Sequence, residues 1–532
     1  MPAPGALARP SQSLATCHSF TLPALTQEGR EEGPLPFSNR NTKLLEKSVT
    51  DTKQTTAPRS NRNKNAFSRA SLYLAFALIA FVAAMPLAAQ QNDATNNLAH
   101  DIYKQLIETN TTESAGNMTI AANDMAARFR AAGFPASDVV VLGPDATHGN
   151  VIARIHGTGA HKPILFLAHL DVVEAKRSDW SMDPFKLTEK NGFFYGRGTS
   201  DVKDGDAILV TNFIRLKQEG YKPDRDLILA LTSDEEGGDF NGVSWLLEKH
   251  RDLIDAEYCI NTDGGDFQLK NGKPLLASIQ TSEKIYADFQ LTVRNKGGHS
   301  SLPTPDNAIY HLANGLVRLS KYEFPVQLNE TTRAFFERMA IIDRGPLSKE
   351  MEGAAKNPPD RAAIGLLSAS PYYDALLRTT CVATRLDAGT ANNALPQDAQ
   401  AIVNCRILPG GTQKETEETL VKVLDDAQIQ VTPLAPPHDS PASPLRKDVL
   451  DATEQSVGKV WPGVPVVPVM DTAATDGYRL RAAGIPTYAV SGVFIDMDDV
   501  RAHGRNERIL ESSFYQGLDF FYRYIKALSS GS

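Results

Sequence analysis

The chain has 532 residues, too many for one hydrophobic core, so two or more domains are expected. Hydrophobic residues make up 42% of the chain and charged residues 22%, as in ordinary globular proteins. The formal net charge of −8 gives no reason to expect nucleic acid as a partner.

The N-terminal region has two parts. Residues 1–65 show no hydrophobic periodicity and are rich in polar residues and proline, which predicts a disordered tail. Basic residues then precede a charge-free stretch whose apolar centre, 72–85, is short for a membrane span. We predict a signal peptide at 66–90, and hence export to the periplasm or the medium, with a membrane anchor as the alternative. Because a long tail before a signal peptide is unusual, we expect translation to start later than Met1.

The stretch 165–173 reads as a buried strand that ends at His169, with Asp171 two residues further on. Its continuous apolar run favours a central parallel strand covered on both faces. Open α/β sheets place their chemistry just beyond the carboxyl ends of such strands. A neutral imidazole there is a good zinc ligand, and the Asp171 carboxylate can accept its other N–H. A loop histidine with a chance acid nearby is the alternative.

Three further segments repeat this pattern of a strand or tight turn followed by an acid. The turn at 196–205 presents Asp201, the strand at 226–232 leads to Glu235 and Glu236, and the strand at 257–261 leads to Asp263. Adjacent glutamates leaving a buried strand are costly unless a cation or a proton compensates their charge. A solvated acidic loop is the alternative at that position.

Two later segments alternate between apolar and polar side chains, at 286–294 and at 399–406. That period is typical of half-exposed antiparallel strands. We therefore predict an α/β fold whose catalytic domain, with a mostly parallel central sheet, is interrupted by an inserted α+β domain at 286–433. The catalytic domain comprises 95–285 and 434–530. The segment 322–380 is longer than a connection needs, and the sequence assigns it no role.

The sequence contains four cysteines. Cys17 lies in the tail, and Cys259 sits in an apolar strand where a core role is expected. Cys381 and Cys405 fall on segments that could be neighbouring strands of the insert. A disulfide between them is plausible if the protein is exported, and two free thiols are the alternative.

Two imidazoles and three carboxylates collect at the strand ends and loops: His169, Asp201, Glu236, Asp263 and His503. This set suits two zinc ions, each with one histidine and one terminal carboxylate, bridged by the remaining carboxylate. Zinc ions roughly 3.5–4 Å apart would share a water, lower its pKa and polarise a carbonyl. Glu235, next to a ligand glutamate, is well placed to take the water's proton and hand it to a leaving amine.

Together these motifs resemble the di-zinc metallopeptidase and aminoacylase family, which includes glutamate carboxypeptidase, aminoacylase-1, succinyl-diaminopimelate desuccinylase and acetylornithine deacetylase. From about residue 95 onward the family's order is kept by His169-Leu170-Asp171-Val172-Val173, Gly196-Arg197-Gly198 with Asp201 and Lys203, Asp234-Glu235-Glu236, Asp263, Gly297-Gly298-His299-Ser300 and His503. The resemblance implies a zinc-peptidase catalytic domain, two Zn²⁺ per subunit (Co²⁺ or Mn²⁺ can substitute), and an insert that serves as lid and dimerises the protein.

The resemblance also implies a role for each residue of the predicted metal site. Asp201 would bridge the two ions, with His169 and Asp263 completing one site and Glu236 and His503 the other. Glu235 would be the general base, and Asp171 would orient His169. The resemblance further implies that the Asp201–Val202 peptide bond is cis.

Four positions resemble the family's substrate-binding residues. His299 resembles the lid histidine that stabilises the oxyanion, often from the partner subunit. Asn393-Ala394-Leu395-Pro396 resembles the lid's Asn-Val-Ile-Pro motif, with conservative departures at its middle positions. Arg406 matches the lid arginine that holds a substrate carboxylate, with a surface strand residue as the alternative. Thr475 matches the substrate-facing loop of the catalytic domain only loosely.

The implied function is zinc-dependent cleavage of the amide bond of a C-terminal amino acid in short peptides or N-acyl amino acids. A narrow biosynthetic deacylase, of the desuccinylase or deacetylase type, is the nearest alternative. A di-zinc aminopeptidase would lack the two lid motifs, and a non-catalytic homologue would have lost a ligand or Glu235. The preferred side chain and acyl group are not predicted.

Overall fold

The computed structural model describes residues 93–115 and 117–530. The predicted tail at 1–65 and the predicted signal peptide or anchor at 66–90 lie outside these residues. None of the helices among the described residues has the length and apolar character needed to cross a membrane.

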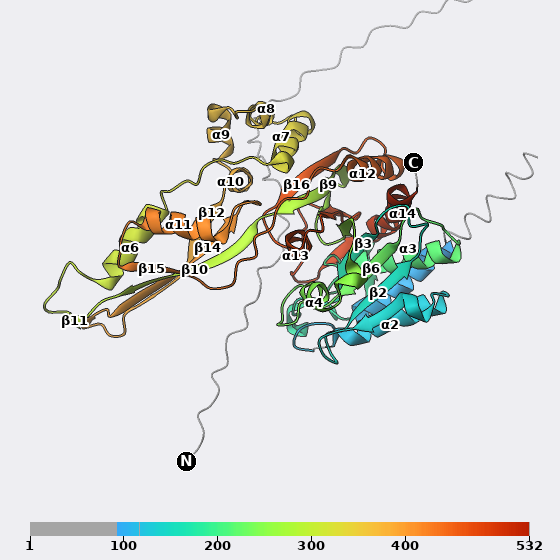
Figure 1. The fold of residues 1–532 in the computed structure, drawn as a ribbon, viewed down its shortest axis with the longest axis horizontal. Coiled ribbons are helices and arrows are strands. Elements are labelled where there is room, and N and C mark those ends of the chain that lie inside the picture. Colours follow the sequence, from blue (N-terminus) through green and yellow to red (C-terminus); the bar gives the residue numbers. More distant parts are fainter. Residues whose placement is uncertain (1–92, 116, 531–532) are drawn as a thin grey trace, which may run out of the picture. The chain divides into compact units, whose positions relative to one another are not determined.

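A ten-stranded sheet organises the catalytic half of the described chain (Figure 1). Its strands are β1 (Val139–Leu142), β2 (Asn150–Ile155), β6 (Leu227–Thr232), β3 (Ile164–His169), β7 (Tyr258–Asn261), β17 (Thr487–Ala489), β9 (Lys273–Glu283), β8 (Phe267–Lys270) and β18 (Phe494–Asp496), in that spatial order, with β16 (Val466–Asp471) paired to β9. The four central strands β6, β3, β7 and β17 run parallel, and antiparallel pairs flank them. The predicted mostly parallel central sheet is therefore confirmed. It brings the carboxyl ends of β3, β6 and β7 to one edge.

Helices cover both faces of this sheet, as the continuous apolar strands require. The first face packs against a helix at 93–108, α2 (Met118–Ala131), α3 (Lys203–Gln218), α12 (Lys447–Val460) and α14 (Glu511–Ser529). The second packs against α4 (Gly242–Lys249), α5 (Arg251–Ile254) and α13 (Gly477–Ala482). Successive side chains of β3 alternate between the two layers: Phe166 lies in the first core and Leu165 and Leu167 in the second. Every residue of β3 is buried.

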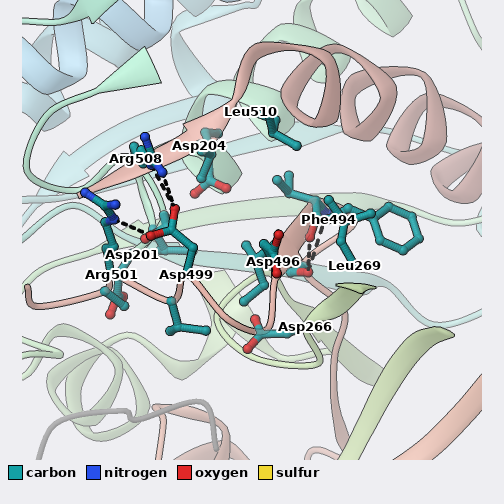
Figure 2. Close-up of a pocket in the computed structure, with 18 of the residues that line it drawn as sticks. Asp201, Asp204, Asp266, Leu269, Phe494, Asp496, Asp499, Arg501, Arg508 and Leu510 are labelled. Carbon is teal, nitrogen blue, oxygen red and sulfur yellow. Dashed lines mark hydrogen bonds and ion pairs between the residues drawn. The ribbon is translucent and has the colours of Figure 1, made fainter. Parts of the chain in front are cut away.

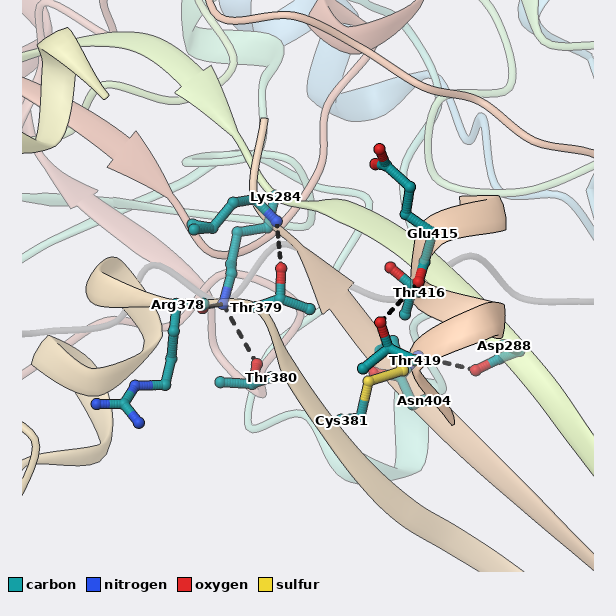
Figure 3. Close-up of a disulfide and its surroundings, with 12 residues drawn as sticks. Lys284, Asp288, Arg378, Thr379, Thr380, Cys381, Asn404, Glu415, Thr416 and Thr419 are labelled. Carbon is teal, nitrogen blue, oxygen red and sulfur yellow. Dashed lines mark hydrogen bonds between the residues drawn. A yellow bond between two sulfur atoms is a disulfide. The ribbon is translucent and has the colours of Figure 1, made fainter. Parts of the chain in front are cut away.

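A smaller antiparallel sheet lies in the predicted insert. Its order is β12 (Thr380–Ala388), β14 (Asp398–Ile407), β10 (Ile285–Arg294) and β15 (Ile429–Pro433), with α6 (Ala308–Leu319) and α11 (Gln413–Leu424) packed on it. Phe289 and Leu291 of β10 are buried while the residues between them are half-exposed, as the alternation predicted. Cys381 and Cys405 face each other across β12 and β14 and form a disulfide (Figure 3).

The segment without a predicted role forms a layer of four short helices. They are α7 (Glu330–Ile342), α8 (Ser348–Ala355), α9 (Arg361–Leu367) and α10 (Pro371–Leu377). Their apolar side chains, Phe336 and Met351 among them, share one core with Val467 and Met470 of β16. Figure 1 shows α7 beside β16, with α8 next to α7 and α9 next to α8. These helices therefore cover the sheet of the catalytic half and leave the insert's own sheet to α6 and α11.

Short elements complete the fold near the loops of the site. A three-stranded sheet joins β4 (Thr188–Lys190), β5 (Phe193–Tyr195) and β19 (Arg508–Leu510), and a two-stranded one joins β11 (Gly298–His299) and β13 (Ala394–Leu395). Because β19 pairs with β5, the chain after His503 is fixed beside the turn that precedes Asp201.

Candidate metal centre

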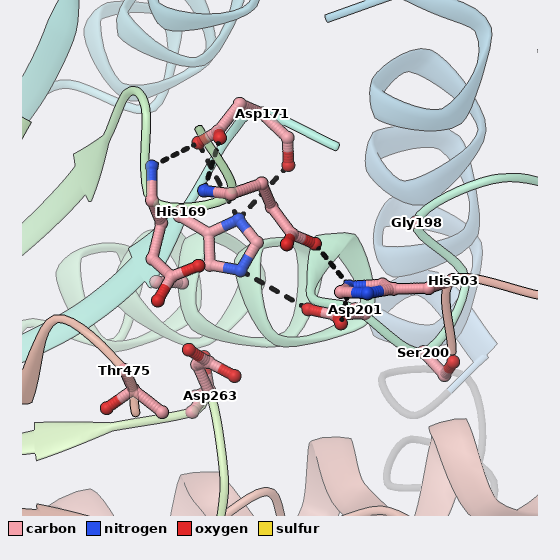
Figure 4. A network of polar contacts seen from close by, with 12 residues as sticks. His169, Asp171, Gly198, Ser200, Asp201, Asp263, Thr475 and His503 are labelled. Carbon is pink, nitrogen blue, oxygen red and sulfur yellow. Dashed lines mark hydrogen bonds and ion pairs between the residues drawn. The ribbon is translucent and has the colours of Figure 1, made fainter. Parts of the chain in front are cut away.

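The five predicted ligands converge on the Asp201 carboxylate (Figure 4). His169 Nε2 lies 3.3 Å from Asp201 Oδ1, and His503 Nε2 lies 2.8 Å from Asp201 Oδ2. Donor atoms of His169, Asp201 and Asp263 lie within 4.8 Å of one another, as do those of Asp201, Glu236 and His503. Asp201 belongs to both groups, with one oxygen facing each histidine. Within the described residues, this is the arrangement expected of two adjoining cation sites with a shared carboxylate.

The parallel sheet explains how these side chains meet. His169 is the last residue of β3, Glu235 and Glu236 follow its neighbour β6, and Asp263 follows its other neighbour β7. Asp201 lies just before α3, and the Asp201–Val202 peptide bond is cis, as the resemblance implied.

One contact of His169 differs from the prediction. We expected its second ring N–H to bind the Asp171 carboxylate, but Nδ1 donates to the backbone carbonyl of Asp171 at 3.1 Å, with the carboxylate 3.7 Å away. The carboxylate instead accepts from the backbone N–H groups of Glu235 (3.1 Å) and Glu236 (2.9 Å). Asp171 therefore fixes the ring of His169 through its backbone and the glutamate loop through its side chain.

The chemistry of this donor set fits divalent cations. Because Nδ1 of neutral His169 carries the proton, Nε2 presents a lone pair to Asp201 Oδ1, a contact that requires a cation or a proton between them. His503 Nε2 faces two carboxylate oxygens, one from Asp201 and one from Glu236, at 2.8 and 2.7 Å. Two imidazoles with carboxylates, some of them buried, match the ligand preferences of zinc.

Without a cation, burial and the neighbouring charges shift the pKa values of the side chains in the cluster. Burial and the charge of Asp201 raise the pKa of Glu236 to about 7. Burial and the charge of Asp263 raise the pKa of Glu235 well above its usual range. Burial lowers the pKa of His503, but contacts with Asp201 and Glu236 outweigh it and raise that pKa to about 10. Without a cation, these side chains therefore retain protons, and a bound cation would displace them.

Sequence reasoning missed a buried ion pair that braces two of the ligand loops. Arg197 Nη1 donates to Glu507 Oε2 at 2.6 Å, and its Nη2 donates to the backbone carbonyl of His503 at 3.3 Å. Glu507 Oε1 accepts from the backbone N–H of Ser200 at 2.8 Å. The pair thus joins the turn before Asp201 to the loop of His503. Arg197 stands in the Gly-Arg-Gly motif, but no local pattern marks Glu507, because its partner is 310 residues away.

A second buried carboxylate, Glu283, holds the loop that contains Thr475. Both the backbone N–H and the hydroxyl of Thr475 donate to Glu283 Oε2 at 3.1 Å, and Arg481 pairs with Oε1. Thr475 was predicted to bind substrate. The structure shows it buried beside Asn261, whose amide donates to its hydroxyl at 3.4 Å. Its contacts therefore orient the loop that lies next to Asp263 (Figure 4).

The predicted lid residues form two separate groups. His299 is exposed, and Ser300 next to it donates its N–H to the carbonyl of Asn393 at 3.0 Å, so the two lid motifs meet where β11 pairs with β13. Arg406 lies on β14, stacks on Tyr286 and donates to the carbonyl of Thr472 at 3.4 Å. Among the described residues, the structure joins Arg406 to the loop of Thr475 but records no hydrogen bond from His299 or Asn393 to the metal cluster.

Comparisons with known proteins identify the family. The model of peptidase family M20/M25/M40 matches residues 165–527. The chain belongs to this family. It is accordingly a hydrolase of the metallopeptidase and amidohydrolase class.

Curated relatives include N-fatty-acyl-amino acid synthase/hydrolase PM20D1 from Xenopus tropicalis, 29% identical over 68% of this chain and 72% of that protein. Carboxypeptidase S from Saccharomyces cerevisiae is 24% identical over 68% and 71%. Among solved structures, the M20 metallo-carboxypeptidase Sso-CP2 from Sulfolobus solfataricus superposes with a TM-score of 0.58 at 19% identity, covering 81% of this chain and 99% of its own. That likeness shows a shared fold.

Proposed function

We propose that this M20 member is a zinc-dependent hydrolase that releases the C-terminal amino acid from short peptides or N-acyl amino acids. One observation carries the proposal: the Asp201 carboxylate stands between His169 and His503, and Glu235 is the chain neighbour of the ligand Glu236. The histidine and carboxylate set would hold two zinc ions, with Co²⁺ or Mn²⁺ as substitutes. Bound there, zinc would acidify the attacking water and polarise the scissile carbonyl.

Glu235 is the proposed general base. Its carboxylate takes a proton from the attacking water and passes it to the nitrogen of the leaving amino acid. The role requires a carboxylate beside the metal site that can hold a proton between two steps. The Asp171 carboxylate keeps the backbone of Glu235 in place.

Arg406 supports the carboxypeptidase polarity. A planar guanidinium can bind the free carboxylate of a terminal residue in a bidentate manner. Its contact with the carbonyl of Thr472 places it next to the loop that Glu283 and Thr475 hold beside the metal cluster.

A homodimer through the lid is proposed as the active form. His299 and Asn393 are exposed on the lid, so a second copy offers a route by which they reach a metal cluster. The edge strand β12 also exposes Val382 by 60% and Leu386 by 64%, and an open apolar edge is a ready template for another strand.

Mixing two inactive variants tests the dimer directly. In a heterodimer of Glu235→Gln and His299→Ala subunits, the subunit with intact Glu235 receives the intact His299 of its partner. Recovery of activity on mixing supports action across the dimer. If each variant alone is inactive and every mixture stays inactive although light scattering shows dimers, His299 does not act across subunits.

Export is proposed from the disulfide. Cross-linked cysteines persist in oxidising compartments, and the Cys381–Cys405 bridge supports the predicted signal peptide. Fractionation of cells that produce the full-length chain, followed by N-terminal sequencing of the mature protein, tests this. Intact protein in the cytosolic fraction would contradict it.

The reaction is tested with a panel of dipeptides, N-acyl amino acids and their C-terminal amides, with and without chelator. Free acids should be cut, amides should be cut about a hundredfold more slowly, and chelator should abolish turnover until zinc, cobalt or manganese is returned. The relative named for N-fatty-acyl-amino acids supports including acylated substrates. Efficient cleavage of amides with refusal of N-acylated substrates would instead indicate an aminopeptidase.

A further inference from the structure

A cavity of about 320 Å³ adjoins the proposed metal centre (Figure 2). Asp201 and Asp263, two of the five proposed ligands, form part of its wall, as does Ala502 next to His503. Other parts of the wall come from β8, β18 and β19 and from the segment that follows Asp263. A substrate whose scissile amide lies at the metal centre therefore has this cavity beside it.

Carboxylates outnumber basic groups in this wall. The aspartates that line the cavity are Asp201, Asp204, Asp263, Asp266, Asp496 and Asp499. Among the described residues, Arg501 and Arg508 are the basic side chains of the wall, and both donate to Asp499 at 2.6 Å. A bound metal centre would compensate Asp201 and Asp263. The two arginines exceed Asp499 by one charge, which is fewer than the three charges of the other aspartates when these are ionised. The cavity therefore favours a cation.

Asp204 supplies a second observation that points to a ligand. The residue is only 5% exposed, and its Oδ1 has no hydrogen-bond partner among the described residues. Figure 2 shows its carboxyl group directed into the space that Asp496 and Asp499 border. Burial raises the pKa of Asp204 to about 8, and the charges of Glu507 and Asp201 add to that shift. The ionised form of this carboxyl is therefore costly unless a cation is bound next to it.

The apolar part of the wall is suited to a short aliphatic stem. Leu269, Val493, Phe494 and Ile509 are each at most 5% exposed and belong to the main core of the catalytic half. Because core side chains are closely packed, this part of the wall is preformed. Lysine and arginine side chains combine such a stem with a charged end. An apolar cavity of about 150 Å³ binds benzene, so about twice that volume has room for the roughly five to seven heavy atoms of either side chain.

We infer that this cavity is a subsite for a cationic side chain on the amino-terminal side of the scissile amide, and that Asp204 binds its charged end. The inference rests on the proposed hydrolysis and names its substrate class: short peptides whose penultimate residue is lysine or arginine. The stem would lie against Leu269 and Phe494, and the ammonium or guanidinium group would donate to Asp204 Oδ1. Hydrolysis adds one water across the amide, releasing the C-terminal amino acid and a product that ends in the basic residue.

The test compares lysyl-, norleucyl-, Nε-acetyl-lysyl- and glutamyl-phenylalanine, which share the α-amine and the C-terminal residue. Norleucine has the aliphatic stem of lysine without its charge. We expect kcat/KM for the lysyl dipeptide to exceed that for the two neutral ones at least tenfold, because only lysine forms the charge-assisted contact, and the glutamyl dipeptide should be cut most slowly. Equal rates for the lysyl and norleucyl dipeptides would overturn the cationic subsite and leave the proposed hydrolase intact. Cleavage of no peptide and no N-acyl amino acid would instead overturn the proposed function itself.

Two variants locate the effect in the cavity. Asp204→Asn keeps the shape of the side chain and removes its charge, so the ratio of kcat/KM for the lysyl over the norleucyl dipeptide should fall at least fivefold. Asp496→Asn should lower the same ratio by a smaller factor, and Asp252→Asn, at an exposed acid of α5, is the matched control and should leave it unchanged. Thermal unfolding and elemental analysis show that each variant is folded and binds zinc.

An unchanged ratio in folded, zinc-loaded Asp204→Asn would contradict the inference. If Asp204→Asn does not fold or does not bind zinc, Asp496→Asn decides the question, because it removes a second charge from the same wall. An unchanged ratio in that variant would then overturn the cationic subsite.

Two further measurements separate a cationic side chain from other cations. Elemental analysis should find the same number of metal ions in the wild type and in Asp204→Asn. An additional ion that only the wild type binds would assign Asp204 to an inorganic cation and overturn the inference. Hexanoyl-phenylalanine has the carbon chain of the norleucyl dipeptide without its α-amine. If it is cut at least tenfold more slowly than the norleucyl dipeptide while the lysyl and norleucyl dipeptides are cut equally, the cavity recognises the α-amine, and the side-chain assignment is wrong.

Discussion

The catalytic sheet and the lid present their functional residues in opposite ways. Around the sheet, His169 and Asp263 are buried and Glu236 is half-buried, and each has a donor atom within 4.8 Å of one from Asp201. On the lid, His299 and Asn393 are exposed, whereas Arg406 lies at the other end of the lid strands, against the loop of Thr472.

The two regions therefore differ in how far their functional residues are in place before substrate binds. The proposed metal centre is preorganised. The ends of the parallel strands position its ligands, and additional hydrogen bonds, such as those to the Asp171 carboxylate, hold them before substrate binds. The lid residues form no such cluster in one chain, so their contribution requires movement of the lid or a second subunit. Removing the general base from the sheet side should therefore abolish the reaction, whereas removing the substrate contact Arg406 from the lid should weaken it.

The largest effect is expected at Glu235. Glu235→Gln removes the proton carrier and keeps the shape of the site, so kcat should fall by about 10³–10⁴ while bound zinc, measured by elemental analysis, stays unchanged. Asp239→Asn, at an exposed acid of the same loop, is the matched control and should keep full activity. Turnover at the wild-type rate in Glu235→Gln would show that the base lies elsewhere.

Arg406 should give a smaller loss that depends on the substrate. Arg406→Ala removes a charge-assisted contact worth a few kcal/mol and should lower kcat/KM for free acids about a hundredfold. C-terminal amides, which lack the carboxylate, should be affected much less by the same variant. Arg361→Ala, at an exposed arginine of α9, serves as control. Equal losses on acids and amides would show that Arg406 has a structural role and that the lid does not select for a free C-terminal carboxylate.

Glu507 tests whether zinc binding depends on a residue that holds the ligand loops without being a ligand itself. Glu507→Gln weakens the brace between the Asp201 turn and the His503 loop without touching a ligand. Partners of metal ligands typically contribute 10- to 100-fold, so the dissociation constant for zinc should rise by about that factor in competition with a chelating dye. Glu248→Gln, at a side chain that is 69% exposed on α4, should leave zinc binding unchanged. Unaltered zinc binding in Glu507→Gln would show that the loops hold their ligands without the brace.

The sequence predicted the residues of the proposed metal centre far better than it predicted the contacts that hold them in place. A continuous apolar strand followed by His or Glu is a local pattern, so β3, β6 and β7 and the residues after them could be located from it. The Cys381–Cys405 disulfide was one of two alternatives that the sequence left open, and the structure decides between them. Glu507 and Glu283 could not be found, because their partners come together only through the tertiary fold. The predicted hydrogen bond from His169 to the Asp171 carboxylate was wrong for a similar reason, because the path of the backbone after β3 determines which oxygen of Asp171 faces the ring.

Lys284, where β9 passes into the lid strand β10, should give the smallest effect. It is 1% exposed, and its Nζ donates to the carbonyl of Arg378 at 2.8 Å and to Thr380 Oγ1 at 3.2 Å (Figure 3). Burial lowers its pKa to about 7; Asp374 opposes that shift and Arg406 adds to it. In the unfolded chain the pKa is about 10.4.

Between pH 7 and about 10.4 the unfolded chain therefore binds one more proton at this residue than the folded chain does. Stability should rise with pH in that window, by at most about 1.4 kcal/mol per pH unit. Lys284→Met, which keeps the length of the side chain without its charge, should remove this contribution from denaturant unfolding measured at pH 7, 8 and 9. Lys321→Met, at an exposed lysine of the lid, is the control. If Lys284→Met and wild type show the same slope, Lys284 stays charged in the folded protein, and the junction between sheet and lid tolerates a buried cation.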